Sequence, residues 1–297
     1  MPATLDMKFD RRPSTFAYML RAFHRSAGLR KTGGFPPVRA SWRQYRVDAR
    51  RLSLFLRLSG LRADGTLPLI YPHVFGFPLQ MAILTHTAFP LPIWNSLQIR
   101  NHLLQHRSIG ETDVLDLETR VAGQRILDKG AEVDLHTNVS SRNELLWESL
   151  NTFYYRGRFG EPGAASPLAR APAVADQLLA QWHTATGLGW RFGGLTGDYN
   201  PIHWSHRLAR RSGFKHAFHH PQLVLGQCMA HLPAPDPAAA QRLDAWLKGP
   251  VYYDSDVRLR ASMEPDRTAF ALIGPGEERP AILGSWYCPS AAECRLL

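Results

Sequence analysis

The chain has 297 residues, of which 44% are hydrophobic and 20% are charged. This length and composition suffice for one large domain or two ordinary ones with a substantial core, and they exclude a mainly disordered chain. A formal charge of +10 indicates an anionic partner, namely nucleic acid, membrane lipid or a phosphorylated small molecule, unless it only reflects an arginine-rich composition.

No integral membrane segment is expected, because the most apolar stretch, Leu67–Trp94, is interrupted by two histidines, a glutamine and five prolines. The cysteines are three in number and have no CxxC spacing, at Cys228, Cys288 and Cys294. They argue against a disulfide framework or a zinc module and favour a cytoplasmic location.

Residues 1–40 form a basic extension that contains one short helix candidate. Pro13 and Ser14 offer a helix start. Apolar residues recur behind it at helical spacing, at Phe16, Met19, Leu20 and Phe23. Two interpretations stay open, a helix that docks on the body of the protein through this face and a segment with a membrane-surface or targeting role.

The remainder divides at a linker, residues 161–175, in a stretch rich in Pro, Gly, Ala and Ser. In the first half, residues 41–160, a buried helix is expected at His73–His86, with a break or kink at Pro78. Strands are expected at Asp113–Ala122, Ala131–Val139 and Leu145–Tyr155. The second of these alternates strictly, which predicts one buried face and one solvent-exposed face.

The second half, residues 176–297, repeats this order of elements. A buried helix is expected at Gln222–Leu232. Strands are expected behind it at Val251–Met263, Thr268–Ile273 and Ala281–Cys288. A central apolar helix followed by antiparallel strands, present twice, predicts two copies of one α+β unit.

The segment richest in chemical groups is Phe192–Gln222. Gly, Asp, Asn and Pro lie close together between Gly197 and His203, which predicts a stiff turn. Such a turn holds Asp198 and His203 in fixed positions, where a carboxylate and an imidazole can share one water as a general acid/base pair. The alternative is a turn-capping aspartate beside an ordinary buried histidine.

This segment closely resembles the signature of the MaoC-like family, also called hydratase 2. The resemblance rests on TGDYNPIH, residues 196–203, followed by ARRSGF, residues 209–214. It implies a double hotdog, in which each half wraps an antiparallel sheet around a long helix. It also implies a non-catalytic first half that shapes an acyl tunnel and a catalytic second half. Four aromatic residues suit either the core or that tunnel wall: Phe75, Phe77, Phe89 and Trp94.

The resemblance further implies (R)-specific hydration of trans-2-enoyl thioesters, or the reverse dehydration of (R)-3-hydroxyacyl thioesters, by a hydro-lyase of fatty acid metabolism. Asp198 and His203 act on one water and Asn200 orients them. The substrate is an acyl-CoA or acyl carrier protein thioester, and no cofactor is needed. The alternatives are a catalytically impaired acyl-thioester-binding protein and a hotdog thioesterase. The chain is expected to be a monomer or a homodimer.

Two departures from the family pattern concern catalysis. The family has a glycine whose amide faces the thioester oxygen, whereas this chain has Pro221, which lacks an N–H. The donor is then the amide of Gln222 or the ring of His220. A serine that supports the catalytic histidine in the family is replaced here by Met229.

Two clusters have competing interpretations. Arg210, Arg211 and Lys215 form either a solvated helix face or a seat for CoA phosphates or an acidic carrier protein. No nucleic-acid-binding motif accompanies them. Five histidines lie within residues 203–220, at His203, His206, His216, His219 and His220. They suit a metal site, but the family signature explains His203 without metal, and none is expected.

Overall fold

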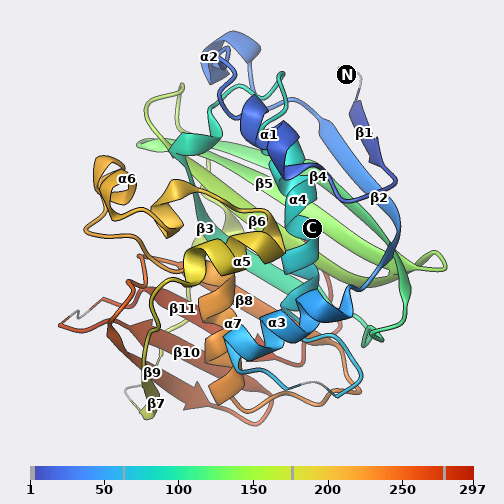
Figure 1. Ribbon diagram of the computed structural model, residues 1–297, viewed down its shortest axis with the longest axis vertical. Coiled ribbons are helices and arrows are strands. Elements are labelled where there is room, and N and C mark those ends of the chain that lie inside the picture. Colours follow the sequence, from blue (N-terminus) through green and yellow to red (C-terminus); the bar gives the residue numbers. More distant parts are fainter. Residues whose placement is uncertain (1–3, 63, 175–176, 277–278) are drawn as a thin grey trace.

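The computed structural model describes residues 4–62, 64–174, 177–276 and 279–297. Within these residues, eleven strands form one sheet in the order β1-β2-β4-β5-β6-β3-β8-β11-β10-β9-β7 (Figure 1). The strands of the first half are β1 (Leu5–Phe9), β2 (Val38–Arg46), β3 (Ser96–Gln105), β4 (Val114–Leu127), β5 (Gly130–Ser141) and β6 (Glu144–Arg156). Those of the second half are β7 (Leu178–His183), β8 (Gln241–Leu247), β9 (Asp256–Met263), β10 (Arg267–Ile273) and β11 (Ile282–Tyr287).

Apart from β1, the strand order is symmetric about the pair formed by β3 and β8. The series β2-β4-β5-β6-β3 of the first half matches β7-β9-β10-β11-β8 of the second, and the two series meet where β3 pairs with β8. Each half therefore contributes the same five-stranded antiparallel unit, with β1 added in parallel at one edge. This arrangement confirms the predicted repeat.

Each unit wraps around one apolar helix. The helices are α1 (Thr15–Arg21), α2 (Leu29–Thr32), α3 (Ala49–Ser59), α4 (Tyr71–Leu84), α5 (Leu188–Thr196), α6 (His206–Arg211) and α7 (Pro221–His231). The central ones are α4 and α7, which confirm the two predicted helices. Every residue of α4 is buried, and Pro78 lies within it. None of the described helices is long and apolar enough to cross a bilayer.

The seam between the halves was not predicted. β3 and β8 pair antiparallel over residues 100–105 and 241–246, with His102 opposite Asp244. The His102 Nδ1 lies 2.7 Å from an Asp244 carboxylate oxygen, and Tyr287 donates its hydroxyl to the other at 2.9 Å. These groups are buried. The seam is thus a desolvated polar contact within a continuous sheet.

The polar face of β5 is buried, contrary to the expectation of a solvent-exposed face. Glu132, Asp134 and His136 are each at most 6% exposed. Arg100 and Arg125 both pair with Glu132, and Arg125 also reaches Asp134 at 2.6 Å. The alternation correctly identified a strand, but ion pairs rather than water satisfy its polar side chains.

The linker and the C-terminal segment contact this outer face of the sheet. The Trp246 indole donates to the Leu168 carbonyl at 2.9 Å, and the Gly163 N–H donates to the Ile126 carbonyl at 2.9 Å. Near the C-terminus, Leu296 packs against Leu104 in a small apolar cluster. The linker is therefore attached by hydrogen bonds to strands of both halves as well as connecting them.

The basic extension packs on the body, but of the four apolar residues on the predicted face Met19 is the one that packs against the core. Ser14 caps α1, as expected. Tyr18 is the fully buried residue of α1, whereas Phe16, Leu20 and Phe23 are 77%, 65% and 76% exposed. Helical spacing of apolar residues here did not identify the docked face. The expected end of the extension at residue 40 falls inside β2.

Close packing in the second half depends on a glycine that faces an aromatic ring. Gly284 on β11 pairs with Phe270 on β10, and a Cβ at residue 284 would lie 2.2 Å from the Phe270 Cζ atom. The ring is fully buried and cannot move aside. We expect Gly284→Ala to lower the free energy of unfolding by about 1–3 kcal/mol through overpacking. Urea unfolding measures it.

The matched control is Gly163→Ala, where the nearest atom to a new Cβ is a carbonyl oxygen at 3.9 Å. This change should leave the urea midpoint close to that of the parent protein. Equal midpoints for the two variants would contradict the packing assignment.

Candidate active site

The loop that carries the candidate acid and base begins where α5 ends. Gly197 caps α5 with a left-handed φ of 85°, and its N–H donates to the Gly193 carbonyl at 2.7 Å. A Cβ at this position would lie 2.0 Å from the Tyr18 hydroxyl oxygen. Both the backbone angle and the close approach of α1 therefore require glycine here.

Short hydrogen-bonded turns fix the next residues. The Asp198 N–H donates to the Thr196 hydroxyl at 3.0 Å, and the Asp198 Oδ1 accepts the Asn200 N–H at 3.0 Å. The Asn200 side-chain oxygen accepts the Ile202 N–H at 3.3 Å and caps a 3₁₀ turn over Pro201–His203. These bonds orient the Asp198 carboxylate while its Oδ2 faces the neighbouring imidazoles.

His203 has one ring nitrogen engaged by the backbone. Its Nδ1 lies 3.0 Å from the Phe218 carbonyl oxygen, which only accepts, so Nδ1 carries the proton. Its Nε2 lies 3.8 Å from the Asp198 Oδ2. That separation is too long for a direct hydrogen bond, and one water beside the pair can bond to both atoms. The Phe218 carbonyl thus holds the His203 ring in place, which the apolar side chain of Met229 cannot do by a hydrogen bond.

Burial favours the neutral imidazole. His203 is 5% exposed, and desolvation lowers its pKa below the ordinary value, while the negative charge of Asp198 partly opposes that shift. The ring of His220 stacks on it with centroids 3.8 Å apart. Burial also places the pKa of His220 well below its ordinary value, and the nearby His203 lowers it further. Burial and the stacked ring of His220 therefore both surround the His203 imidazole with groups that do not favour its charged form.

A narrow cavity of about 100 Å³ opens beside this pair, and both halves of the chain line it. The second half contributes polar groups from Asp198, Asn200, His203 and Gln222. Mostly apolar residues close the other sides: Met19, Ala22, Phe77, Met81, Ile93, Trp94, Leu97 and Phe153. Phe77 and Trp94 thus line the cavity, whereas Phe75 and Phe89 belong to the core. The cavity suits an apolar chain with a polar reacting end.

The N-terminus of α7 points at the same cavity. Pro221 is its first residue and has no N–H, but the next residue, Gln222, has one, and both line the cavity. The Gln222 side chain donates to Gln98 on β3, which donates to Asn151 at 2.9 Å. His220 is not among the lining residues, and its Nε2 bonds to the Asp198 carbonyl at 3.0 Å. Of the two residues expected to supply the donor, Gln222 is the one that lines the cavity.

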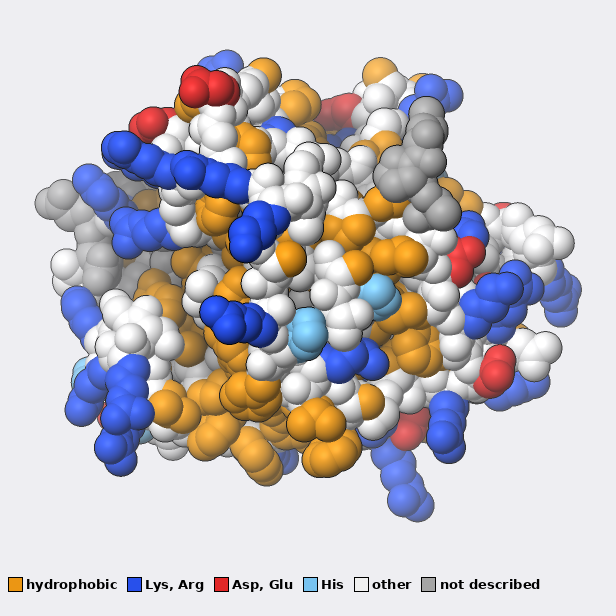
Figure 2. Space-filling view, turned by 90° about the horizontal axis from the view of Figure 1, so that it is seen from above, with side chains coloured by type: hydrophobic (Ala, Val, Ile, Leu, Met, Phe, Trp, Pro, Cys, Tyr) orange, Lys and Arg blue, Asp and Glu red, His pale blue; other side chains and the backbone are white. Residues whose placement is uncertain are grey.

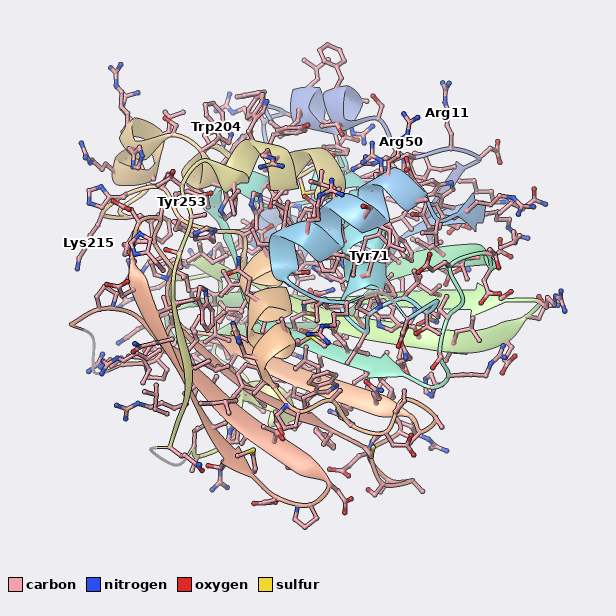
Figure 3. The ribbon with its side chains drawn as sticks, turned by 60° about the horizontal axis from the view of Figure 1, so that its bottom comes forward. Arg11, Arg50, Tyr71, Trp204, Lys215 and Tyr253 are labelled. Carbon is pink, nitrogen blue, oxygen red and sulfur yellow. The ribbon has the colours of Figure 1, made fainter. Side chains whose placement is uncertain are left out.

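His203 also lines a second, larger space. This cleft of about 790 Å³ has walls from Trp190, Trp204, His206, His216 and Tyr253. Figure 3 shows Trp204 and Tyr253 at the same end of the molecule, with Lys215 pointing outward there. Arg210, Arg211 and Lys215 are exposed and line neither space. The structure therefore brings Asp198, Asn200, His203 and Gln222 together and leaves the basic cluster outside them.

Asp198, His203 and His220 are also the described residues that could hold a metal ion, with ligand atoms within 4.8 Å of one another. The geometry fits poorly, because His220 would first have to release the Asp198 carbonyl. His206 and His216 pack together elsewhere, on the cleft. His219 packs on Tyr253. The expectation that the site works without metal stays a prediction.

Four side chains that were not predicted hold the segment from Gly194 to His203 in place. Arg12 and Arg51 donate to the carbonyls of Leu195 and Gly194, at 2.8 and 2.7 Å. Tyr18 donates to the Gly197 carbonyl at 2.7 Å, and Tyr253 donates to the His203 carbonyl at 2.7 Å. Arginines at the C-terminal end of α5 complement its dipole. No local pattern signals these contacts, because their partners are distant in sequence.

Comparisons with known proteins identify similar sequences and structures. Residues 179–273 match the family model described as a MaoC like domain. The 3-hydroxyacyl-thioester dehydratase X of Mycobacterium tuberculosis is 27% identical over 233 residues, which span 77% of this chain and 82% of that protein. The crystal structure of HtdX from that organism superposes with a TM-score of 0.70 at 25% identity, covering 84% of this chain and 99% of the other.

A MaoC-like dehydratase from Phytophthora capsici superposes with a TM-score of 0.69 over 90% of this chain and 100% of its own. At 18% identity, this second likeness bears on the fold alone. Together with the repeated helix-wrapped sheet, these findings show that the chain has the double-hotdog fold and that residues 179–273 match a MaoC like domain.

Proposed function

We propose that this protein is a hydro-lyase for acyl thioesters. It hydrates trans-2-enoyl thioesters to (R)-3-hydroxyacyl thioesters, or catalyses the reverse dehydration. The observation that carries the proposal is the 3.8 Å separation of the His203 Nε2 and the Asp198 Oδ2 at one end of a mainly apolar cavity. Similarity to a 3-hydroxyacyl-thioester dehydratase supports it.

The two groups share one water molecule. The water oxygen bonds to the β-carbon of the enoyl thioester, and the pair accepts a proton from that water. The pair returns a proton to the α-carbon, so that hydrogen and hydroxyl add across the double bond and no other reactant is consumed. Either residue can perform either transfer, because a coupled pair shares its proton.

Negative charge builds on the thioester oxygen as water attacks. The Gln222 N–H at the start of α7 supplies a hydrogen bond and the positive end of a helix dipole. The side-chain bond from Gln222 to Gln98 fixes that residue against the first half. Because Pro221 has no N–H, the hydrogen-bond donor is the next residue, Gln222, and the negative charge on the thioester oxygen is still stabilised.

The substrate's polar arm lies in the larger cleft. His203 lines both spaces, so a thioester held beside it can place its acyl chain in the narrow cavity and its pantetheine arm in the cleft. Arg210, Arg211 and Lys215 then bind the phosphates of CoA or of an acyl carrier protein. The reaction requires no organic cofactor.

Removing either member of the pair should abolish hydration. We expect Asp198→Asn and His203→Gln each to lower kcat for crotonyl-CoA by roughly 100-fold or more, because proton transfer in the transition state is lost. Loss of the enoyl-thioester absorbance measures the rate. The matched control is the exposed pair His183 and Asp256, which lie 2.9 Å apart on β7 and β9. Similar losses in the doubly substituted control would refute the assignment.

The rate of hydration should also fall at low pH. When His203 is the member of the pair that takes the proton from water, protonation of its ring inactivates it, and its pKa lies below the ordinary value. We expect kcat/KM for hydration to stay constant down to about pH 6.5 and to fall only below that. A pH–rate profile checks this. A decline that begins above neutral pH would contradict a buried neutral base.

A second candidate is an acyl-thioester-binding protein that has lost turnover, which the missing N–H of Pro221 favours. Pro221→Gly separates the two functions. If the Gln222 amide is the donor, kcat should stay within roughly threefold of the parent value, since the donor is already present. A rise of about 100-fold would show instead that Pro221 leaves the site incomplete. Equal unfolding midpoints confirm that α7 is intact.

A further inference from the structure

The outer face of α1 exposes three large apolar side chains. Phe16, Leu20 and Phe23 are 77%, 65% and 76% exposed, and they recur at intervals of four and three residues. They therefore stand on one side of the helix and its following turn. A cluster of this kind on a protein surface marks an interaction site more often than chance exposure does.

The chain around these side chains carries charge of a single sign. Residues 11–31 contain six Lys and Arg and no Asp or Glu. Four of these cations are exposed: Arg11, Arg25, Arg30 and Lys31. Figure 2 looks onto the end of the molecule where α1 and α2 lie, and it shows hydrophobic side chains with Lys and Arg around them. The face thus complements an anionic surface.

The inner face of α1 is part of the candidate active site. Met19 and Ala22 line the narrow cavity, and the Trp94 indole donates to the Ala22 carbonyl at 3.0 Å. The ring of Phe23 packs on Trp94 with centroids 5.4 Å apart. One short helix therefore separates an apolar cavity from the exposed apolar cluster.

We propose that the outer face of α1 docks on the surface of an anionic lipid bilayer. Phe16, Leu20 and Phe23 enter the boundary between headgroups and acyl chains, and the surrounding cations lie at the headgroup phosphates. Side chains that stand out from a convex helix suit insertion between lipids, whereas a folded partner needs a closely packed, complementary surface. The inference concerns binding alone and does not depend on the proposed reaction.

Vesicle flotation with the full chain tests it. The parent protein should float with vesicles of phosphatidylcholine mixed with phosphatidylglycerol and should not float with phosphatidylcholine alone. Replacing Phe16, Leu20 and Phe23 together by serine should weaken binding by roughly tenfold or more. Replacing Arg11 and Arg25 by glutamine should weaken it by roughly fivefold per arginine.

Matched controls use exposed residues elsewhere. Leu178 and Met263, 53% and 50% exposed on β7 and β9, are replaced by serine, and Arg43 and Arg142 by glutamine. These variants should float like the parent protein, and equal unfolding midpoints show that each variant is folded. Absence of binding by the parent, or equal binding by the serine variant of α1, overturns the proposal. So does α1-dependent binding to an acidic acyl carrier protein without binding to vesicles.

Discussion

The antiparallel pairing of β3 with β8 is the contact on which the rest of the structure depends. It joins two five-stranded units into one sheet and sets α4 and α7 in fixed positions relative to each other. Gln98 on β3 consequently meets Gln222 on α7, and the apolar wall of the first half closes the cavity beside His203. Residues of both halves are therefore needed to line the cavity beside His203.

The two units differ in one connection. In the first half, residues 60–70 join α3 to α4. In the second half, residues 197–220 join α5 to α7 and contain the Asp198–His203 turn and the basic helix α6. The second half thus carries the Asp198–His203 turn, and the first half contributes Tyr18, whose hydroxyl donates to the Gly197 carbonyl of that loop.

The sequence was sufficient for the central helices, for six of the strands and for the Asp198–His203 loop, because these depend on local periodicity and on one distinctive motif. It was insufficient for β3 and β8. Their arginine, histidine and aspartate residues are buried in pairs, so the usual correlation between polarity and exposure fails there. The docked face of α1 was missed for a related reason. Tyr18 is buried by a hydrogen bond to Gly197, which lies 179 residues away in the chain.

The linker over the outer face has a consequence for how the chain withstands cleavage. Leu168 bonds to Trp246 on β8 and Gly163 bonds to Ile126 on β4, so the linker is attached to strands of both halves. A protease that cuts between residues 160 and 175 leaves both halves joined through their shared sheet. The pairing of β3 with β8 does not involve the linker, so nicked protein should stay associated.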